Sequence, residues 1–404
     1  MHRVVITGMG AVTPLGHTAP ATWAAMREGR GAIGPIASLA AEDLRAGIAA
    51  EVTDFDPARH FDGKRLLLLD RFSQFALVAA REAIAHSGVD FEADALGANT
   101  AVVIGTGIGG EHTHDAASRR LYGDRSPRTH PLTIVRLMAS APASHIGIEF
   151  GLTGPAFATS SACASSNHAL AQAFQMVRSG VARAAIAGGS EACITLGVVR
   201  AWEAMRVMAD DTCRPFCKQR RGMVLGEGAA MFVLETLEDA QRRGAPILAE
   251  FAGAGMSADA GDIVFPSEAG AALAIQRALD DAALAPADID YINAHGTGTP
   301  GNDPTETAAI RRVFGAAADR LAVSSTKSMH AHALGAAGAI ELVAAIGALR
   351  DQVVPPTANF LDADLDCDLD YVPNAAREMP VRAVLSNSFA FGGLNAVVAL
   401  RRAG

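Results

Sequence analysis

The stretch SSACASSNHALAQAF, residues 160–174, carries a single cysteine, Cys163, at the point where the sequence changes its pattern. The preceding residues AFATSSA (156–162) are typical of a strand, and the apolar residues after Cys163 recur at the spacing of one helix face. Gly180 is a typical helix stop, so a strand, a polar turn and a helix are predicted over 156–179. A thiol at a helix start is favoured as a thiolate, because free N–H groups and peptide dipoles point at it. The alternative interpretation is that Cys163 is a small buried apolar residue.

Short β-branched runs alternate with longer alanine-rich runs along the whole chain. Many of the short runs are apolar on both faces, which is typical of strands in a sheet covered by helices on each side. The predicted strands cover residues 3–8, 100–107, 156–162, 182–189, 229–235, 247–255, 289–296, 321–328 and 396–402. The run 335–350 is apolar nearly all round and is therefore expected to be a deeply buried helix. The sequence thus predicts an α/β protein.

Two pairs of segments indicate an internal repeat. NTAVVIGTG (99–107) resembles DIDYINAHGTG (288–298), and AFATSSACASSNHAL (156–170) resembles LAVSSTKSMHAHALGAAGAIE (321–341). In the second pair, each member is a strand, a polar turn with reactive side chains, and a buried helix. We therefore predict two related halves, 1–244 and 245–404, which offer strand-end residues to one shared cleft. No Pro/Ser-rich linker separates the halves, so they are expected to pack tightly.

The bulk composition excludes several classes of protein. With 404 residues, half of them apolar and 19% charged, the chain is expected to be globular rather than disordered. Its net charge of −9 and the lack of a dense basic run argue against nucleic-acid binding. The segment MHRVVITGMG (1–10) lacks the features of a signal peptide, and no apolar run approaches the ~20 residues that span a bilayer. A cytoplasmic location without a membrane span is therefore expected.

The cysteines suggest neither a disulfide framework nor a metal site. They are odd in number and widely scattered, at Cys163, Cys193, Cys213, Cys217 and Cys367. The pair Cys213 and Cys217 has no matching His/Cys pair at zinc-like spacing, whereas a structural zinc site wants four ligands. No metal is therefore expected.

A glycine-rich turn, NAHGTGTPGND (293–303), is the second candidate stretch. His295 follows a predicted strand and opens this turn, with Thr297 and Thr299 close behind it. A histidine at a strand end, in a loop that admits close approach, is a candidate catalytic residue. The alternative interpretation is a histidine whose hydrogen bonds are satisfied by the backbone of the turn.

Two more stretches toward the C-terminus carry suitable groups. SSTKSMHAHALGAAGAIE (324–341) offers Lys327, His330 and His332, and Glu341 on the predicted helix could pair with the lysine. Two histidines two residues apart are expected to point to different faces of an extended segment, so at most one of them enters a site. In NSFAFGGLN (387–395), a glycine pair permits a turn that could aim a backbone N–H at an oxyanion, or simply a tight turn.

The turn GTGIGG (105–110) matches the dinucleotide-binding pattern G-x-G-x-x-G, but its context does not. A dinucleotide site wants this turn in the first βαβ unit, with an acidic residue about twenty residues further along. Here the strand that leads into the turn begins near residue 102, and Pro127 and Pro131 interrupt the segment after it. Nucleotide binding is therefore not expected.

Together these motifs resemble those of the β-ketoacyl-acyl carrier protein synthases. They are SACAS with Cys163, NAHGTGT with His295, SSTKSMHAH with Lys327 and His332, and FAFGGLN with Phe391, in the family's order and spacing. The similarity runs from RVVITGMGAVTPLG (3–16) to the final strand, and the type II elongating enzymes are the most similar group. WEAMRVMADDTCRPF (202–216) and KSMHAH (327–332) are also similar to the nodulation-type branch, which elongates specialised acyl chains.

This resemblance implies a fold and a reaction. The fold is thiolase-like, with two similar halves in a five-layer αβαβα sandwich, usually as a homodimer and without a cofactor. The reaction is a decarboxylative Claisen condensation of an acyl thioester with malonyl-acyl carrier protein, which makes the enzyme an acyltransferase. Cys163 takes the acyl group as a thioester, and His295 and His332 stabilise the enolate formed from the malonyl group. Backbone N–H groups of Cys163 and Phe391 form the oxyanion hole.

The resemblance also implies supporting roles. Lys327, held by Glu341, orders the site electrostatically, and Phe391 gates the acyl pocket by swinging its ring. The pantetheine arm of the carrier is bound by Thr297 and Thr299. The positions that match the family's acyl pocket are Ile108, Val198 and Trp202.

The sequence departs from the family at several positions. His330-Ala331 stands where the family often has Thr-Gly, and the spacing of five from Lys327 selects His332 as the catalytic histidine. Arg221 and Leu394 replace an acidic residue and a threonine that are frequent in the family, which affects local pairing only. KRLLLLDRF (64–72) has leucines where relatives carry basic residues for the carrier. Docking of the carrier is then expected to use Lys64, Arg65, Arg125, Arg128 or Arg206.

Three other functions share this type of fold or site. A non-catalytic chain-length-factor-like partner of another synthase typically lacks the nucleophilic cysteine, whereas Cys163, His295 and His332 are all present. A thiolase would want a second cysteine near the C-terminal glycine turn, and FAFGGLN has none. A cysteine hydrolase would admit water to the acyl-enzyme, and the sequence leaves slow hydrolysis open.

Overall fold

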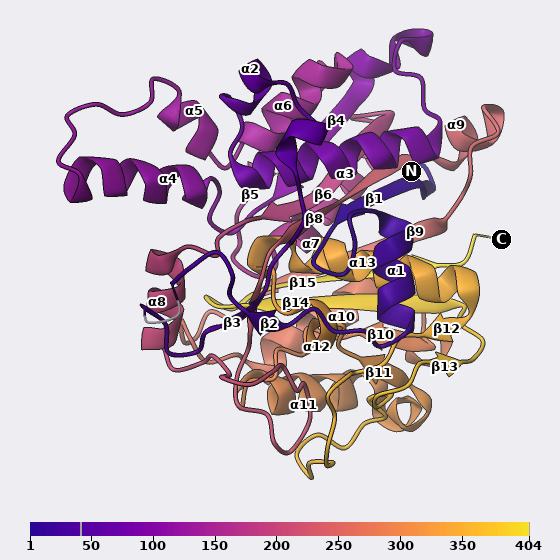
Figure 1. Cartoon of the computed structure of the whole chain (residues 1–404). Helices are drawn as coiled ribbons and strands as arrows, with labels where there is room; N and C mark the ends of the chain where they lie inside the picture. The colour runs from indigo at the N-terminus through magenta and orange to yellow at the C-terminus, as the bar shows by residue number, and fades with distance from the viewer. Residues whose placement is uncertain (41–42, 404) are drawn as a thin grey trace.

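The computed structural model describes residues 1–40 and 43–403 (Figure 1), so the final residue of the second predicted half, Gly404, lies outside the described residues. Its main sheet has ten strands in the order β11-β10-β14-β15-β9-β1-β8-β6-β4-β5. These strands are β1 (Val4–Val12), β4 (Thr100–Gly105), β5 (Ala156–Thr159), β6 (Ala184–Glu191), β8 (Gly228–Thr236), β9 (Ala249–Ala258), β10 (Tyr291–Asn293), β11 (Ala322–Ser324), β14 (Ala383–Ala390) and β15 (Leu394–Arg401).

The helices are α1 (Ala19–Arg27), α2 (Gly63–Leu66), α3 (Arg71–Ser87), α4 (Glu111–Ser118), α5 (Thr133–Leu137), α6 (Ala141–Phe150), α7 (Ser165–Ser179), α8 (Leu196–Ala204), α9 (Leu237–Arg242), α10 (Glu268–Ala282), α11 (Asn302–Phe314), α12 (Lys327–His330) and α13 (Ala337–Asp351). One small sheet contains β2 (Gly34–Pro35), β3 (Ile48–Ala50) and β7 (Leu225–Gly226), and another pairs β12 (Val353–Val354) with β13 (Arg377–Glu378).

The strand order confirms the internal repeat. In the first half β4 pairs parallel with β5 and β6, and β8 runs antiparallel between β6 and β1. In the second half β10 pairs parallel with β11 and β14, and β15 runs antiparallel between β14 and β9. Numbered along each half, both read third, second, fourth, fifth, first, and the two first strands, β1 and β9, pair antiparallel where the halves meet.

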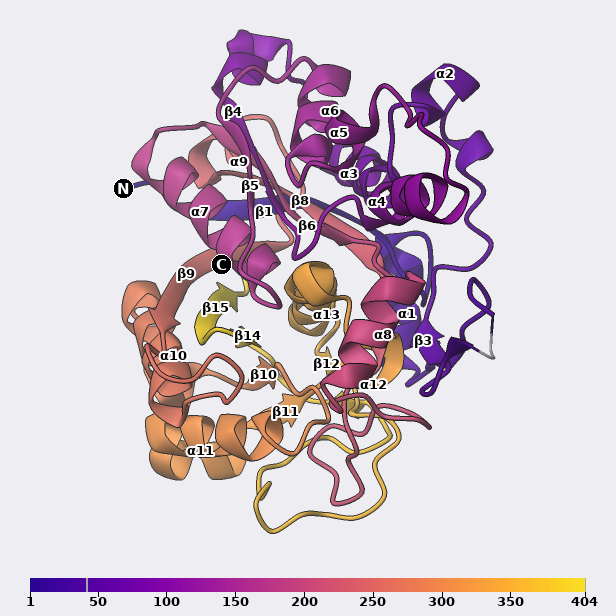
Figure 2. The ribbon, with the colours of Figure 1, turned by 90° about the vertical axis from the view of Figure 1, so that its left-hand side faces the viewer.

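The helices form three layers around the two halves of the sheet, which is the predicted αβαβα arrangement. Figure 2 shows α7 and α13 in the middle, between the strands of the first half and those of the second. The outer face of the first half is covered by α3, which packs on β1 and β8, and that of the second by α10, which packs on β9 and β15. Every residue from Ala337 to Leu349 of α13 is buried, as its all-round apolar sequence predicts.

Close approach of α7 to the sheet fixes where Cys163 lies. A Cβ placed on Gly105, at the end of β4, would come within 2.4 Å of the Ser165 backbone, so only glycine permits this contact. The helix ends at Gly180, which adopts a left-handed φ of 79°, as the sequence predicts. The C-terminal end of β4 and the start of the Cys163 helix are thereby held against one another.

Two local features differ from what the sequence predicts. Residues 383–390 form a buried strand, β14, which was not predicted because its polar side chains disguise it in the sequence. The turn expected at the glycine pair lies at 391–393, directly after this strand. The segment around Lys327 is not extended, since residues 327–330 form a short helical turn, α12, which ends at Ala331 with a φ of 57°. It is this helical turn, rather than strand alternation, that sends His330 and His332 in different directions.

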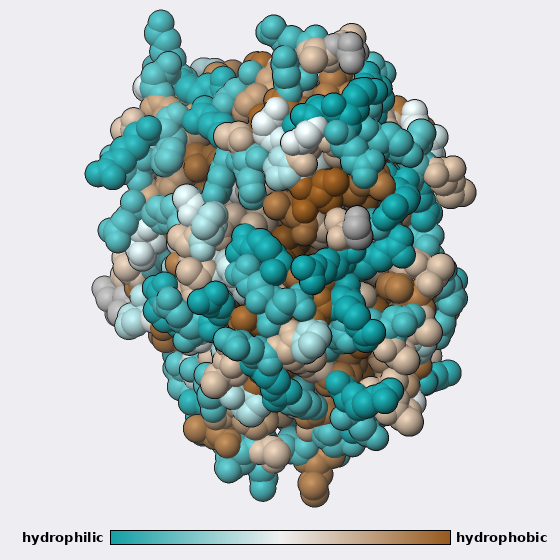
Figure 3. All heavy atoms as spheres, turned by 90° about the vertical axis from the view of Figure 1, so that its right-hand side faces the viewer, coloured by the Kyte–Doolittle hydropathy of each residue, from teal (hydrophilic) through white to brown (hydrophobic). Residues whose placement is uncertain are grey.

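The face seen from the right of Figure 1 is mostly hydrophilic, with apolar side chains gathered in a hollow in its upper half (Figure 3). Among the residues that the structure describes, no helix is both long and apolar enough to cross a membrane.

Candidate active site

Cys163 lies in the tight turn between β5 and α7. The residue before it, Ala162, has a φ of 48°, which is unusual for a residue other than glycine. The Ser165 hydroxyl accepts a hydrogen bond from the Ser161 N–H at 2.9 Å and donates one to the Ala162 carbonyl at 2.7 Å. Cys163 is only 5% exposed, so the turn presents its thiol to the interior of the protein rather than to bulk solvent.

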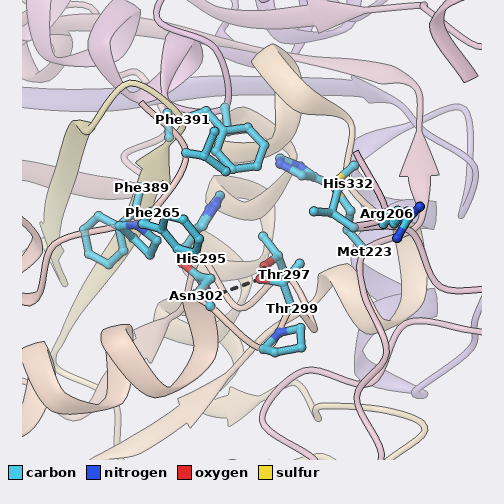
Figure 4. Close-up of a pocket in the computed structure, with 17 residues that line it drawn as sticks. Arg206, Met223, Phe265, His295, Thr297, Thr299, Asn302, His332, Phe389 and Phe391 are labelled. Carbon is cyan, nitrogen blue, oxygen red and sulfur yellow. Dashed lines mark hydrogen bonds between the residues drawn. The ribbon is translucent and has the colours of Figure 1, made fainter. Parts of the chain in front are cut away.

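Two histidines from the other half of the chain lie beside this thiol. His295 follows β10, and His332 follows α12, and their rings meet almost edge to face with centroids 5.4 Å apart. Cys163 Sγ and one ring nitrogen of each histidine all lie within 4.8 Å of one another. Figure 4 shows both imidazoles at the same cavity, near the ring of Phe391. Residues far apart in the sequence thus converge on one point.

Both imidazoles are held neutral. Burial, followed by the charge of the Lys327 ammonium, lowers the pKa of His295 and of His332 well below the ordinary value. Neither Nδ1 atom has a hydrogen-bond partner among the described residues, nor does Nε2 of His332. Neutral rings with free nitrogens can donate a hydrogen bond from one nitrogen or accept a proton at the other.

The thiol itself is protonated in the resting protein, contrary to the expectation of a thiolate. Burial raises the pKa of Cys163 to about 12, and the positive charge of Lys327 offsets only part of this. The helix α7 begins two residues later, at Ser165, so its dipole does not overcome the cost of burying a charged sulfur. The backbone N–H groups of Cys163 and Phe391 both point at the sulfur.

A buried lysine ties the two histidine-bearing segments together. Lys327 Nζ donates to the carbonyl of His295 at 2.6 Å and to the carboxylate of Glu341 on α13, and neither charged residue is exposed. Burial raises the pKa of Glu341 to about 7, and the neighbouring ammonium acts in the opposite direction. Because the lysine charge is paired in this way, it is tolerated in the interior.

A second buried carboxylate, which sequence reasoning missed, holds the His295 turn. Glu306 on α11 accepts hydrogen bonds from the backbone N–H groups of His295 and Gly296, both at 2.8 Å. In the sequence, Glu306 looks like an ordinary acidic residue near the start of a helix. The role of Glu306 in fixing the His295 turn becomes visible only in the fold, where α11 meets that turn.

Phe391 lies in the turn that follows β14. Its neighbours Gly392 and Gly393 have φ values of 80° and 68°, which only glycine adopts easily. The Phe391 ring stacks on the indole of Trp202 from α8, with centroids 5.8 Å apart and an interplanar angle of 25°. The backbone N–H of Phe391 therefore faces the Cys163 thiol, while its ring packs on the indole of Trp202.

A cavity of about 170 Å³ connects these groups to the surface. Thr297 and Thr299 lie in its wall, with their hydroxyls 2.9 Å apart, and so do Arg206, Met223 and Phe265 (Figure 4). The last two were not singled out in the sequence, because single apolar residues in loops carry no distinctive signal.

The residues assigned to the acyl pocket lie outside the lining of this cavity. Val198 and Trp202 are on α8 and pack against the apolar cluster that contains Cys163. Ile108 lies in the loop after β4, is 41% exposed, and donates its backbone N–H to Glu191 at 3.2 Å. His330 is also not among the residues that line the cavity. Its Nε2 atom lies 3.0 Å from the Thr326 hydroxyl.

The G-x-G-x-x-G turn binds an internal carboxylate. Glu191, at the end of β6, accepts hydrogen bonds from the N–H groups of Gly107 at 2.6 Å and Ile108 at 3.2 Å. The amides that would cradle a phosphate in a nucleotide site are therefore already occupied by a side chain.

Within the described residues, Cys163, His295 and His332 are the only group of three side chains placed to hold a metal ion. Sulfur and imidazole ligands of this kind suit Zn²⁺, which binds three protein ligands in open sites. Such an ion would occupy the thiol and both imidazoles at once, so metal binding and nucleophilic chemistry at this site exclude one another.

Comparison with known proteins finds relatives along nearly the whole chain. The profile of the β-ketoacyl synthase N-terminal domain matches residues 1–240, and that of the C-terminal domain matches 248–361. The chain is 49% identical over 400 residues to nodulation protein E of Rhizobium sp. (strain N33), covering 99% of each chain. It is 41% identical over 410 residues to 3-oxoacyl-[acyl-carrier-protein] synthase 2 of Staphylococcus aureus (strain COL), covering 99% of this chain and 98% of the relative. The solved ishigamide ketosynthase/chain length factor superposes with a TM-score of 0.95 at 37% identity over the full length of both chains.

Proposed function

Because the chain belongs to the β-ketoacyl synthase family, we propose that Cys163, His295 and His332 are the groups with which it condenses acyl chains. The protein catalyses an acyl-carrier-dependent condensation in acyl-chain elongation. One observation carries the assignment of residues: the thiol and two neutral imidazoles lie within 4.8 Å of one another beside a cavity. Its similarity over 98% of the length of the 3-oxoacyl-[acyl-carrier-protein] synthase 2 relative supports its assignment as a type II acyltransferase.

The first half-reaction loads the acyl group onto Cys163. The sulfur attacks the thioester carbonyl of the acyl carrier, a new C–S bond forms, and the bond to the pantetheine sulfur breaks. Because the resting thiol is protonated, its proton passes to a neutral neighbouring imidazole and then to the leaving pantetheine thiol. The N–H groups of Cys163 and Phe391 stabilise the oxyanion, each typically by about 3 kcal/mol.

The second half-reaction extends the chain. Malonyl carrier enters the emptied cavity and loses CO₂, and the electron pair of the broken C–C bond forms an enolate. Hydrogen bonds from His295 and His332 stabilise the enolate oxygen, and its carbon attacks the acyl–Cys163 thioester. The Cys163 sulfur leaves as the β-ketoacyl carrier is formed, so atoms and charge balance without a redox partner.

The remaining assignments support these two steps. Lys327, held by Glu341, positions the His295 turn, and its charge adds to burial in keeping both imidazoles neutral. Thr297 and Thr299 bind the pantetheine arm, since their hydroxyls line the route to the thiol. Ile108, Val198 and Trp202 shape the acyl pocket beyond the Phe391 ring, which must swing aside for the chain to enter.

The partner is an acyl carrier protein, which the name of the 3-oxoacyl-[acyl-carrier-protein] synthase relative specifies for that protein. Arg206 is exposed and lines the cavity, so it is placed to meet an acidic carrier or its phosphopantetheine. Lys64, Arg125 and Arg128 are exposed as well, whereas Arg65 is already paired with Glu149 at 2.9 Å. Charge reversal at Arg206 is expected to weaken carrier binding, and unchanged affinity would remove this residue from the docking surface.

The chain is proposed to act as a homodimer. β5 is an edge strand of the main sheet, and its first two residues are exposed, with Phe157 at 36%. Unpaired strand edges with exposed apolar residues are suited to pairing with another chain. Ile134 and Ile148, on the neighbouring helices α5 and α6, add exposed apolar surface at 64% and 72%.

Product analysis tests the proposed function and its alternative. The chain is incubated with an acyl carrier and malonyl carrier, and the products are identified by mass. A ketoacyl product, and its loss in Cys163→Ala, is expected. A free fatty acid would indicate a hydrolase, and no turnover with either carrier would favour the chain-length-factor-like partner.

A further inference from the structure

The turn before α7 holds the nucleophile in a strained conformation. Ala162 keeps a left-handed φ of 48°, which costs free energy for a residue with a side chain and persists only where the surroundings enforce it. The Ser165 hydroxyl bonds the backbone of Ser161 and Ala162, on the N-terminal side of Cys163. Two backbone hydrogen bonds also close this turn, from the Ala164 N–H to the Ser161 carbonyl at 3.1 Å and from the Ser165 N–H to the Ala162 carbonyl at 3.2 Å.

One imidazole reaches both sides. His168 lies on the first turns of α7, and its Nδ1 atom is 2.9 Å from the Ser161 hydroxyl and 3.1 Å from the carbonyl oxygen of Ala164. Ser161 precedes Cys163 by two residues, and Ala164 follows it directly. The same nitrogen therefore touches the chain before and after the nucleophile.

We propose that His168 is a positioning residue for the nucleophile, whose Nδ1 links Ser161 to Ala164 and so fixes the direction of the Cys163 thiol. It does not touch the reacting atoms and is not among the residues that line the cavity. This inference rests on the proposed function, since it presumes that Cys163 carries the acyl group. Removal of the link lets the turn relax, which moves the sulfur away from the two N–H groups that face it.

A matched pair of variants tests the role of this nitrogen. In His168→Asn, the side-chain amide places a polar atom at the position of Nδ1, whereas in His168→Gln it lies near the position of Nε2. His168→Asn is expected to load acyl groups within about threefold of the wild-type rate, and His168→Gln about 10- to 100-fold more slowly. His145→Gln, a half-buried histidine on α6, serves as the control and is expected to be unchanged.

The two half-reactions separate positioning from general damage to the fold. Acyl loading of Cys163 is measured in a single turnover, and decarboxylation of malonyl carrier alone is measured as released CO₂. His168→Gln is expected to slow loading while decarboxylation, which uses His295 and His332, changes less than about twofold. Equal loading rates in the Asn and Gln variants, or an equal fall of both half-reactions, would overturn the inference.

A second variant and a separate control make the result interpretable. Ser161→Ala removes the same link from its other end, so it is expected to reproduce the loading defect, and the double variant with His168→Gln to add nothing further. If His168→Gln does not fold, Ser161→Ala alone decides, and normal loading in it overturns the inference. Failure of the proposed function is distinguishable, because either the wild-type chain would then form no acyl-enzyme or ketoacyl product, or Cys163→Ala would still form one.

Discussion

Protonation states, rather than residue identities alone, set the chemistry at the residue scale. A buried thiol with a pKa of about 12 beside two neutral imidazoles is a resting state in which the nucleophile must lose its proton during the reaction. The Lys327 ammonium adds to burial in lowering the pKa values of His295 and His332, and it partly offsets the rise that burial causes in the pKa of Cys163. The charge of one lysine thus adjusts three groups.

The two histidines of the KSMHAH motif are expected to differ sharply. His332→Ala removes an imidazole from the cavity and should lower condensation about 10²- to 10³-fold, as loss of one oxyanion donor does. His330→Ala should cost less than about tenfold, because His330 lies outside the cavity lining and its ring lies beside Thr326. Single-turnover condensation rates measure both. An equal loss in the two variants would contradict the assignment of His332.

The pH profile of acyl loading depends on the lowered pKa values. A histidine of ordinary pKa would be about three-quarters protonated at pH 6. Because the pKa values of His295 and His332 lie below that range, both remain neutral there, and protonation reduces activity only at lower pH. The loading rate is therefore expected to change less than about twofold between pH 6 and 7.5. A rise of about tenfold per pH unit would instead indicate that the thiolate forms by exchange with solvent.

At the scale of elements, the first turn of α7 connects the two halves. Ser166 accepts a hydrogen bond from the N–H of Ala339 in α13 at 3.0 Å, and Asn167 donates to the carbonyl of Ser386 in β14 at 3.1 Å. Successive residues of the stretch 165–168 thus brace the nucleophile turn and bind the opposite half. These contacts hold the nucleophile of one half in place relative to the histidines of the other half.

Loss of the α7–α13 contact should be costly. Ser166→Ala leaves the buried N–H of Ala339 without its partner and is expected to lower the free energy of unfolding by about 1–3 kcal/mol. Ser179→Ala, at the exposed end of the same helix, should change it by less than about 0.5 kcal/mol. Urea denaturation of the full chain measures both variants. Equal midpoints would show that the contact between the helices contributes nothing.

At the scale of the whole molecule, the sheet is continuous through β1 and β9 but ends at an exposed strand, β5. The other end of the sheet, β11, is buried, whereas the β5 edge offers unpaired backbone groups beside apolar side chains. This asymmetry is the physical basis for expecting a second copy of the chain at that edge.

The dimer is tested by its mass in solution. Light scattering of the wild-type chain should give about twice 41.6 kDa at micromolar concentration. Phe157→Glu, on the β5 edge, is expected to shift the mass toward that of the monomer. Leu365→Glu, at an apolar residue that is 97% exposed in the other half, should leave the dimer intact. A wild-type monomer, or a Phe157→Glu variant as dimeric as the wild type, would exclude this edge as the interface.

Features that depend only on residues close together in the sequence could be predicted from the sequence alone. Periodicity indicated most strands and the buried helix 335–350, the segment pairs indicated the internal repeat, and the quoted motifs led to the family. The strand β14 was not predicted, because its alternating serine and asparagine residues are polar. In the fold they are buried, and hydrogen bonds to distant elements satisfy them, such as that between Asn387 and Glu306. Local pattern cannot report partners that come from elsewhere in the chain.

How the candidate residues meet, and in which charge state they rest, depends on the folded molecule. The expected thiolate at Cys163 was wrong because the cost of burying a charge depends on how completely other segments cover it, and this outweighs the dipole of the adjacent helix. For the same reason, the link from His168 to both sides of Cys163 and the stack of Phe391 on Trp202 have no signature in the sequence. Solvent exclusion and distance are properties of the whole fold.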